Sequence, residues 1–326
     1  MGSRLLLDLV RADKKVRALK RESSNLSLIK AVFEAEKHSS YFDRIEWFSG
    51  DVLDSFSLEE AMMDVNQVYH CAGMVSFLPK EEKRMMKINA EGTAHVVNAA
   101  VEKGIRKLCF VSSIAALGRG DNNELIAEDK PWKNSYENSA YAVSKYSAER
   151  EVWRGIAEGL NAVIVNPSVI LGPGNGENSS SAIFGKVWKG LKFYTEGVDG
   201  FVDVRDVAKA MTMLMDSDIS NERFIVSSEN CSYKNLVFEI ARCFGKPLPG
   251  IKANRWMGEL VWRAEALRSI LTGSKPFLTK QIVETSMGKY FYSNEKIKAR
   301  LGMEFIPVQK SIEDTCSFFL KNQFTS

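Results

Sequence analysis

Histidine and paired cysteines are scarce in this chain. Its 326 residues include three histidines, and the five cysteines contain no Cys-x-x-Cys pair. Separated ligands of this kind argue against a zinc or other metal site, and an odd number of scattered thiols is typical of a reducing compartment. No apolar run approaches the roughly 18 residues that span a bilayer, and the opening residues are too short in their apolar part for a signal peptide. We therefore expect a cytoplasmic protein with no transmembrane segment and no metal.

An excess of one charge is also lacking. The chain has 44 lysines and arginines and 41 aspartates and glutamates, which are interspersed and give a net charge of +3. This balance predicts no nucleic-acid-binding surface. With 45% hydrophobic and 26% charged residues, the composition is that of a folded globular protein. The length suits one large domain or a domain with a smaller partner.

Predicted strands and helices alternate through the first half of the chain. The spacing of apolar residues predicts helices at 3–12, 26–37, 57–63, 81–103 and 136–158, and strands at 15–19, 45–49, 67–70, 107–111, 161–166 and 223–226. This alternation indicates an α/β protein with a parallel sheet covered by helices on both faces. Ligands of such sheets bind beyond the carboxyl ends of the strands. The residues at those ends are Asp51, Ala72, Gly73, Ser113, Pro167 and Ser168.

A tyrosine and a lysine stand four residues apart in the predicted helix at 136–158. This spacing places both side chains on one face, so the phenol of Tyr141 and the ammonium of Lys145 can act on the same small volume. The free pKa of tyrosine is about 10, and a nearby lysine favours the phenolate and lowers that pKa. Ser113 could then hydrogen-bond the substrate oxygen that Tyr141 protonates. Since the same spacing also arises by chance, the order of the surrounding motifs decides between the two interpretations.

Six features in the expected order make the chain resemble a known superfamily. They are Asp51, Asn89, Ser113, Tyr141, Lys145 and the turn at Pro167 and Ser168. This set is similar to that of the extended short-chain dehydrogenases/reductases, many of which are described as NAD-dependent epimerases/dehydratases. Within them the chain looks like the dihydroflavonol-reductase and 3β-hydroxysteroid-dehydrogenase-like branch. The resemblance covers nearly the whole chain, including the segments at 201–207 and 293–297, and implies a Rossmann-type doubly wound parallel sheet with a smaller, mostly helical C-terminal substrate region.

The resemblance also implies roles for the matching residues. Tyr141 would donate or accept the proton, Lys145 would hold the nicotinamide ribose and lower the pKa of Tyr141, and Ser113 would orient the substrate carbonyl or hydroxyl. Asn89 would fix a water that links Lys145 to solvent, although it could also only satisfy buried backbone groups. Asp51 could equally be a helix cap. The predicted cofactor-binding residues are Gly2, Arg21, Asp51, Val52, Ala72, Gly73, Tyr141, Lys145, Pro167, Ser168 and Val169.

The choice of cofactor depends on the residues that follow the strand at 15–19. An acidic group at this position receives the ribose hydroxyls of NAD, whereas a basic group accommodates the 2′-phosphate of NADP. The chain has Lys20 and Arg21 here, followed directly by Glu22. We therefore predict NADP(H) in preference to NAD(H).

A glycine-rich turn is the family feature that this sequence lacks. Members begin with a buried strand and Gly-x-x-Gly-x-x-Gly, whose backbone amides hold the pyrophosphate. Here Gly2 matches only the last glycine, and the residues after it match the first helix. Because that strand is central in the fold, we expect a gap between its two neighbours and unpaired backbone groups on both. We expect residues upstream of Met1 to supply the strand; a genuine truncation is the alternative.

The domain prediction follows the resemblance. Residues 1–171 would form the dinucleotide-binding domain without its first strand, 200–228 would return to it, and 172–199 and 229–326 would bind the substrate. The predicted reaction interconverts a carbonyl compound and a secondary alcohol. The alternatives are a nucleotide-sugar epimerase or dehydratase, which could use Lys186, Lys189 and Lys192 for a diphosphate, and a non-catalytic dinucleotide sensor or scaffold. A homodimer through the helices around Asn89 and Tyr141 is expected by analogy alone.

Two groups of apolar residues bear on the substrate side. Phe77, Phe184, Trp188, Phe193 and Tyr194 would suit a hydrophobic or aromatic carbonyl compound, or they belong to the core. At 255–271 six apolar residues form one helical stripe, namely Trp256, Leu260, Val261, Ala264, Leu267 and Leu271. We predict that this stripe packs against the sheet domain, with a membrane-surface helix as the alternative.

Overall fold

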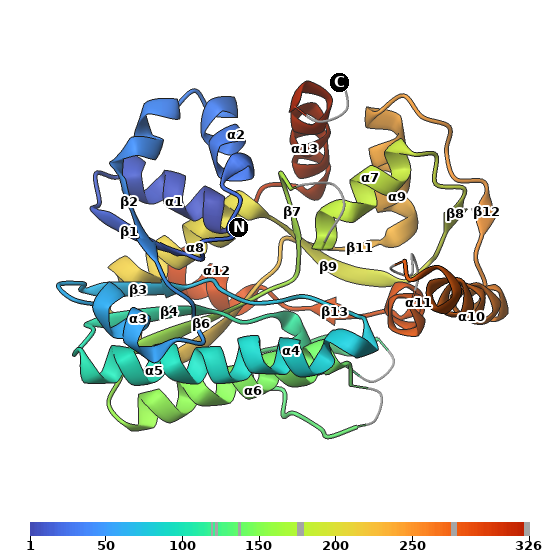
Figure 1. The fold of residues 1–326 in the computed structure, drawn as a ribbon. Helices are drawn as coiled ribbons and strands as arrows, with labels where there is room; N and C mark the ends of the chain where they lie inside the picture. Colours follow the sequence, from blue (N-terminus) through green and yellow to red (C-terminus); the bar gives the residue numbers. More distant parts are fainter. Residues whose placement is uncertain (119, 121–122, 136–137, 175–178, 275–278, 323–326) are drawn as a thin grey trace.

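A parallel sheet with helices on both faces forms the centre of the molecule (Figure 1). The computed structural model describes residues 1–118, 120, 123–135, 138–174, 179–274 and 279–322. Four strands pair in the order β10-β6-β4-β3, all of them parallel. Their bounds are β3 Gln67–His70, β4 Lys107–Val111, β6 Ala162–Pro167 and β10 Glu222–Val226. This arrangement confirms the predicted α/β class.

A second, two-stranded parallel sheet contains β1 (Val16–Lys20) and β2 (Ile45–Ser49). Within the described ranges β1 pairs only with β2, and β3 pairs only with β4. The two unpaired strand edges match the gap that the sequence predicts. Each of the six strands predicted from the sequence lies within one residue of its predicted bounds, because runs of apolar residues closed by turn residues identify strands well.

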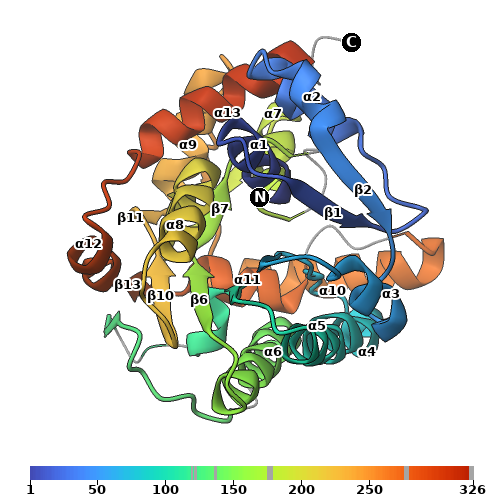
Figure 2. The ribbon, with the colours of Figure 1, turned by 90° about the vertical axis from the view of Figure 1, so that its left-hand side faces the viewer.

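Side chains on β4 and β6 alternate between two hydrophobic cores, since successive residues of a strand point to opposite faces. Cys109 and Val111 join one core with helices α1 and α8, whereas Leu108 and Phe110 join the other with α3, α5 and α6. Figure 2 shows these two helical layers on either side of the strands. The helices of the two layers are α1 Gly2–Arg11, α8 Val204–Asp216, α3 Ser55–Ala61, α5 Gly92–Glu102 and α6 Ala140–Ala157. Helix α2 (Ser27–Ala35) covers the outer pair of strands together with α1.

One predicted helix, at 81–103, is interrupted by a π-helical turn. It consists of α4 (Glu82–Met86), the π-turn Lys87–Glu91 and α5. The hydroxyl of Thr93 donates to the carbonyl oxygen of Asn89 at 2.6 Å and thereby occupies a backbone acceptor inside the turn. Such turns bulge one residue out of a helix and are frequent at functional sites. Apolar periodicity alone could not predict the extra residue.

The C-terminal part combines short strands with helices. A three-stranded sheet has the order β11-β9-β7, and two further pairs are β12-β8 and β13-β5. The bounds of these strands are β5 Leu125–Ile126, β7 Val169–Leu171, β8 Phe193–Tyr194, β9 Val198–Asp203, β11 Glu229–Ser232, β12 Ile251–Lys252 and β13 Phe291–Tyr292. The helices are α7 Ala182–Trp188, α9 Tyr233–Cys243, α10 Arg255–Thr272, α11 Lys280–Met287, α12 Glu295–Leu301 and α13 Val308–Asn322. Helices α7, α9 and α13 share one core.

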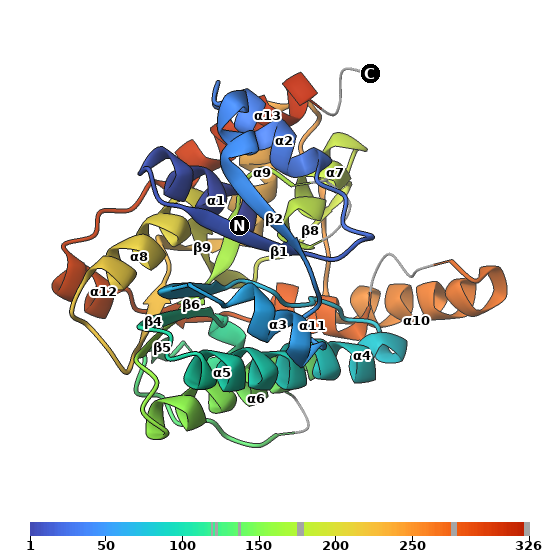
Figure 3. The same ribbon diagram turned by 60° about the vertical axis from the view of Figure 1, so that its left-hand side comes forward.

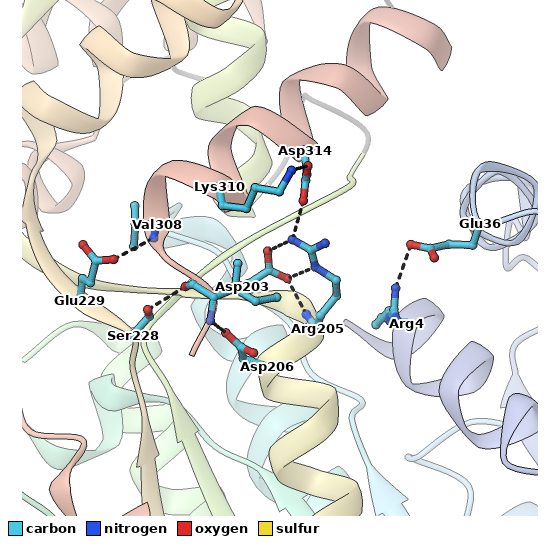
Figure 4. A network of polar contacts seen from close by, with 11 residues as sticks. Arg4, Glu36, Asp203, Arg205, Asp206, Ser228, Glu229, Val308, Lys310 and Asp314 are labelled. Atoms are coloured by element: carbon cyan, nitrogen blue, oxygen red, sulfur yellow. Dashed lines mark hydrogen bonds and ion pairs between the residues drawn. The ribbon is translucent and has the colours of Figure 1, made fainter. Parts of the chain in front are cut away.

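A polar network fixes α13 to the start of α8 (Figure 4). Asp203 caps α8 by accepting from the backbone N–H of Arg205 at 2.7 Å. The guanidinium of Arg205 pairs with Asp203 at 2.6 Å and with Asp314 of α13 at 2.9 Å. Asp206 accepts from the backbone N–H of Ile306 at 2.8 Å, just before α13 begins. The segment at 201–207, which ends β9 and begins α8, therefore holds the C-terminal helix α13.

The prediction that the stripe of α10 packs against the sheet domain is wrong. All six stripe residues are exposed, and Gly258 is the only buried residue that α10 contributes. A Cβ atom at Gly258 would lie 2.5 Å from Val283 of α11, so this glycine permits the close contact between the two helices. The sequence correctly predicts an amphipathic helix, but α10 contacts α11 through the face that carries Gly258 and not through the apolar stripe. Among the described helices none is long and apolar enough to cross a membrane.

Candidate active site

The candidate site lies where β4 ends and α6 begins. Ser139 caps α6 by accepting from the backbone N–H of Ala142 at 2.8 Å, which satisfies one of the free amides of the first turn. Tyr141 stands in that first turn, and Lys145 follows one turn later on the same face. Ser113 is the second residue after β4 and caps a short helical turn, with its hydroxyl accepting from the N–H of Ala115 at 3.2 Å.

The Ser113 hydroxyl lies close enough to the Tyr141 phenol to influence its pKa. Burial raises the pKa of the Tyr141 phenol above its ordinary value, and the nearby Ser113 hydroxyl opposes that rise. The ring of Phe77 meets Tyr141 edge-on, with centroids 6.1 Å apart. The ring of Tyr141 therefore packs against Phe77. In this structure burial raises the pKa of Tyr141, whereas we predicted that Lys145 would lower it.

Lys145 is a buried ammonium group beside this pair. Its Nζ donates to the carbonyl oxygen of Val111 at 2.8 Å and lies 4.8 Å from the centroid of the Phe110 ring. Burial lowers the pKa of Lys145 to about 8, and the carboxylate of Glu149 acts in the opposite direction. The last residue of β4 thus orients the ammonium at the carboxyl end of the sheet. A lysine in this state titrates close to physiological pH, which suits a group that stabilises negative charge during proton transfer.

Asn89 is buried, and its side chain makes three hydrogen bonds. Its Oδ1 accepts from the N–H of Met74 at 2.7 Å, and its Nδ2 donates to the carbonyl of Met74 at 2.9 Å and to the hydroxyl of Ser144 at 2.9 Å. These contacts fit the alternative that Asn89 satisfies buried backbone groups. The contact with Ser144, which precedes Lys145, also connects the π-helical turn to α6.

Gly73 lies where the sequence places it, at the carboxyl end of β3 after Ala72. A Cβ atom here would stand 3.4 Å from Oδ1 of Asn89 and 3.7 Å from Nζ of Lys145. Both polar side chains therefore converge on a backbone that has no side chain of its own. This geometry leaves room for a group to approach Lys145, as a nicotinamide ribose would have to do.

Three of the other residues predicted to bind the cofactor, Gly2, Arg21 and Asp51, lie at the start of α1 and just after β1 and β2. Gly2 is the first residue of α1, and Arg21 follows β1 and is exposed. Asp51 follows β2 closely and accepts through Oδ1 from the N–H of Leu53 at 3.0 Å. The cap of α3 is Asp54, so the alternative that Asp51 is a helix cap is wrong.

Two segments border these positions. Val52 packs against α5 so closely that a Cβ atom at Gly92 would be 2.8 Å from Cγ2 of Val52. Pro167 ends β6, and the N–H of Ser168 donates to the carbonyl of Val226 at 3.0 Å before Val169 begins β7. Val52, Pro167 and Ser168 lie at the carboxyl ends of the parallel strands β2 and β6, which is where ligands of doubly wound sheets bind.

The sequence interpretation missed a buried acidic residue next to the site. Glu149 accepts through Oε2 from the hydroxyl of Ser112 at 2.7 Å and from Nδ2 of Asn166 at 2.9 Å, and its Oε1 pairs with Arg223 at 2.9 Å. Asn166 also donates to the carbonyl of Ser113 at 3.0 Å. One carboxylate thus connects the ends of β4 and β6 with β10. The signal was available, since Glu149 follows Lys145 at the same four-residue spacing as Lys145 follows Tyr141.

Of the five aromatic residues predicted for the substrate side, Phe77 is the one with a ring contact to Tyr141. Phe184 is fully buried and belongs to the core of α7, α9 and α13. Lys186 of α7 is half-buried, and burial lowers its pKa. All five cysteines are free thiols. Among the described residues no three His, Cys, Asp or Glu side chains gather in a way that could hold a metal ion.

Sequence comparison finds a family and several relatives. The pattern of the NAD dependent epimerase/dehydratase family matches residues 1–227. A Synechocystis protein provisionally named dihydroflavonol 4-reductase is 25% identical, over 98% of this chain and 91% of its own length. Cinnamoyl-CoA reductase 1 of Petunia hybrida is 28% identical, over 84% of this chain and 76% of its own length.

Solved structures share the whole architecture. The crystal structure of gox2253 superimposes with a TM-score of 0.81 at 26% identity and covers 100% of this chain and 96% of its own. UDP-glucose 4-epimerase of Thermotoga maritima, crystallised with UDP-glucose, has a TM-score of 0.77 at 18% identity and covers 98% and 95%. These likenesses confirm the predicted Rossmann-type fold with its C-terminal region.

Proposed function

Because this chain belongs to the NAD dependent epimerase/dehydratase family, we propose that it interconverts a carbonyl group and a secondary alcohol. Its relatives place it in the dihydroflavonol-reductase-like branch of the extended short-chain dehydrogenases/reductases, which makes it an enzyme of the oxidoreductase type. The observation that carries the proposal is the arrangement of Ser113, Tyr141 and the buried ammonium of Lys145 at the end of β4 and the start of α6.

The residues at the strand ends fit a nicotinamide cofactor. Such a cofactor supplies or accepts a hydride when it is bound. Lys145 would hold the nicotinamide ribose next to Gly73, where no side chain blocks the approach. The exposed guanidinium of Arg21 after β1 favours a cofactor with a 2′-phosphate, so we propose NADP(H) in preference to NAD(H).

Proton transfer would use the chain's own side chains. Tyr141 gives a proton to the substrate oxygen during reduction and accepts it during oxidation, and the Ser113 hydroxyl orients that oxygen. The positive charge of Lys145 stabilises the phenolate that remains. Asn89 is proposed to hold a water that links Lys145 to solvent, from a position fixed by its hydrogen bonds to Met74.

The substrate side is proposed to come from residues 172–199 and 229–326, with Phe77 adding an apolar contact near Tyr141. An aromatic ring at this point suits a hydrophobic or aromatic carbonyl compound. A homodimer through α5 and α6 remains part of the proposal by analogy with the family.

A panel of aromatic and aliphatic carbonyl compounds, assayed by consumption of NADPH and NADH, tests the proposal. Tyr141→Phe removes the phenolic hydroxyl and keeps the ring, so kcat/KM should fall by about 100-fold or more. Tyr146→Phe is a matched control, because Tyr146 lies on the same helix and instead stacks on Trp132 with centroids 4.2 Å apart. Unchanged turnover in Tyr141→Phe would contradict the assigned proton donor.

Two other outcomes would redirect the proposal. Turnover of a nucleotide sugar without net consumption of NADPH would support an epimerase or dehydratase. Tight binding of the dinucleotide, with no turnover of any carbonyl compound or nucleotide sugar, would support a sensor or scaffold.

A further inference from the structure

Exposed apolar side chains are concentrated on and beside α10. Of the 15 exposed large hydrophobic residues in the described chain, eight lie between residues 248 and 271. They are Leu248, Ile251, Trp256, Leu260, Val261, Leu267, Ile270 and Leu271. Figure 3 shows α10 projecting from the rest of the molecule. A patch of this kind on a soluble fold marks an interaction surface.

The arrangement of charges on α10 is that of an interfacial helix. Its 18 residues extend about 27 Å at 1.5 Å per residue. By helical spacing, Arg263 and Arg268 fall at the two margins of the apolar stripe. Glu259 and Glu265 fall nearer the opposite face, and each pairs with one of these arginines. Arginines at the edge of an apolar stripe can bury their alkyl stems and keep the guanidinium at a polar boundary.

The charge of the surrounding segment identifies the partner's chemistry. Residues 246–289 contain eight lysines and arginines and three glutamates, a net charge of +5. Because the whole chain has a net charge of +3, the remaining residues together have a net charge of −2. Positive charge is therefore concentrated in the segment of the sequence that contains the exposed stripe. Two copies of this surface placed face to face would repel each other, whereas an anionic surface would attract it.

We propose that α10 docks this protein on the surface of a bilayer that contains anionic phospholipids. The helix lies in the plane of the interface, with Trp256, Leu260 and Leu267 among the acyl chains and Arg263 and Arg268 at the level of the phosphates. Attraction of the basic segment to the headgroups adds to the burial of the apolar side chains. The proposal concerns a surface away from Tyr141 and Lys145 in the sequence, and its test measures no catalytic activity.

Vesicle sedimentation of the full chain tests the proposal. With vesicles of phosphatidylcholine and phosphatidylglycerol in equal amounts, we expect at least about fivefold more pelleted protein than with phosphatidylcholine alone. High salt should reduce the difference, because exposed charges are screened. Failure of the protein to pellet with the anionic vesicles would overturn the proposal, as would equal pelleting with both compositions.

A matched pair of double variants distinguishes binding through α10 from non-specific binding through other exposed apolar residues. Leu260→Gln combined with Leu267→Gln should return pelleting to the level without anionic lipid, whereas Phe56→Gln combined with Met63→Gln should leave it unchanged. All four positions are more than half exposed, so circular dichroism should show intact folding in both double variants. Light scattering supplies the competing outcome. A dimer of the unaltered protein that becomes a monomer in the α10 variant would assign the stripe to a second copy of the chain and overturn membrane docking.

Discussion

Glu149 tests whether a buried carboxylate next to the candidate site stabilises the fold and tunes the pKa of Lys145. Glu149 is 2% exposed, and its two oxygens accept hydrogen bonds from Ser112 and Asn166 and pair with Arg223. Glu149→Gln keeps the shape of the side chain but removes its charge. It also presents an NH₂ group to one set of donors, so that either Arg223 or the Ser112 and Asn166 pair loses its acceptor.

The expected effect on stability follows from the burial of this pair. Removing one partner of a buried ion pair leaves the other charge uncompensated, which costs about 3 kcal/mol. We therefore expect the free energy of unfolding in urea to fall by that amount in Glu149→Gln. Glu151→Gln is the matched control, since it removes the same charge from α6 at a partly exposed position where Glu151 pairs with Arg154. That variant should lose less than about 1 kcal/mol.

The same substitution should move the pH dependence of catalysis. Burial lowers the pKa of Lys145 to about 8, and the Glu149 carboxylate opposes that lowering. Without the carboxylate the pKa of Lys145 falls further. If turnover needs the charged ammonium, the descending limb of kcat/KM against pH lies near 8 in the unaltered protein and at lower pH in Glu149→Gln. A limb that stays in place, or one that moves to higher pH, would refute the reasoning, provided that Glu151→Gln leaves it unchanged.

Three further predictions concern stability and cofactor choice. Burial raises the pKa of Asp206 to about 6, so folding favours its protonated form and its contribution to stability is lost as pH rises from about 4 through 6. The free energy of unfolding of Asp206→Asn in urea should therefore rise by about 1 kcal/mol relative to that of the unaltered protein between pH 4.5 and 7, after allowance for screening. Asn89→Ala leaves both backbone groups of Met74 without their side-chain partner and should lower the free energy of unfolding by about 3 kcal/mol, and an unchanged unfolding midpoint would contradict this. Arg21→Ala should weaken NADPH binding about tenfold in a fluorescence titration and leave NADH unaffected, with Lys15→Ala as the control at the other end of β1.

Local sequence patterns were sufficient for the strands and for most helices of the central sheet. The runs that form β4 and β6 are mostly apolar on both faces, which is typical of buried parallel strands. The helix at 81–103 shows the limit of this reasoning. Its apolar periodicity predicts one continuous helix, but the side chain of Thr93 bonds to the backbone at Asn89, where a π-helical turn forms.

Part of the candidate site could also be predicted from local sequence patterns. Tyr141 and Lys145 share a helix face by spacing alone, and Ser113 is placed by the end of a strand. Glu149 escaped notice because its partners, Ser112, Asn166 and Arg223, come from three separate strands. The apolar stripe of α10 was assigned to the wrong neighbour, because an amphipathic pattern shows that a face is apolar and not what covers it.

The sequence by itself determined the strand and helix order, the family resemblance and the residues that could carry proton transfer, because these depend on spacing along the chain. Only the tertiary structure decided which groups meet. It placed the Lys145 ammonium on the carbonyl of Val111, tied Asn89 to Ser144, and left the stripe of α10 facing solvent. The physical reason is that burial, and with it the pKa of Lys145 or the exposure of Leu260, is set by elements distant in sequence that pack together in the folded chain.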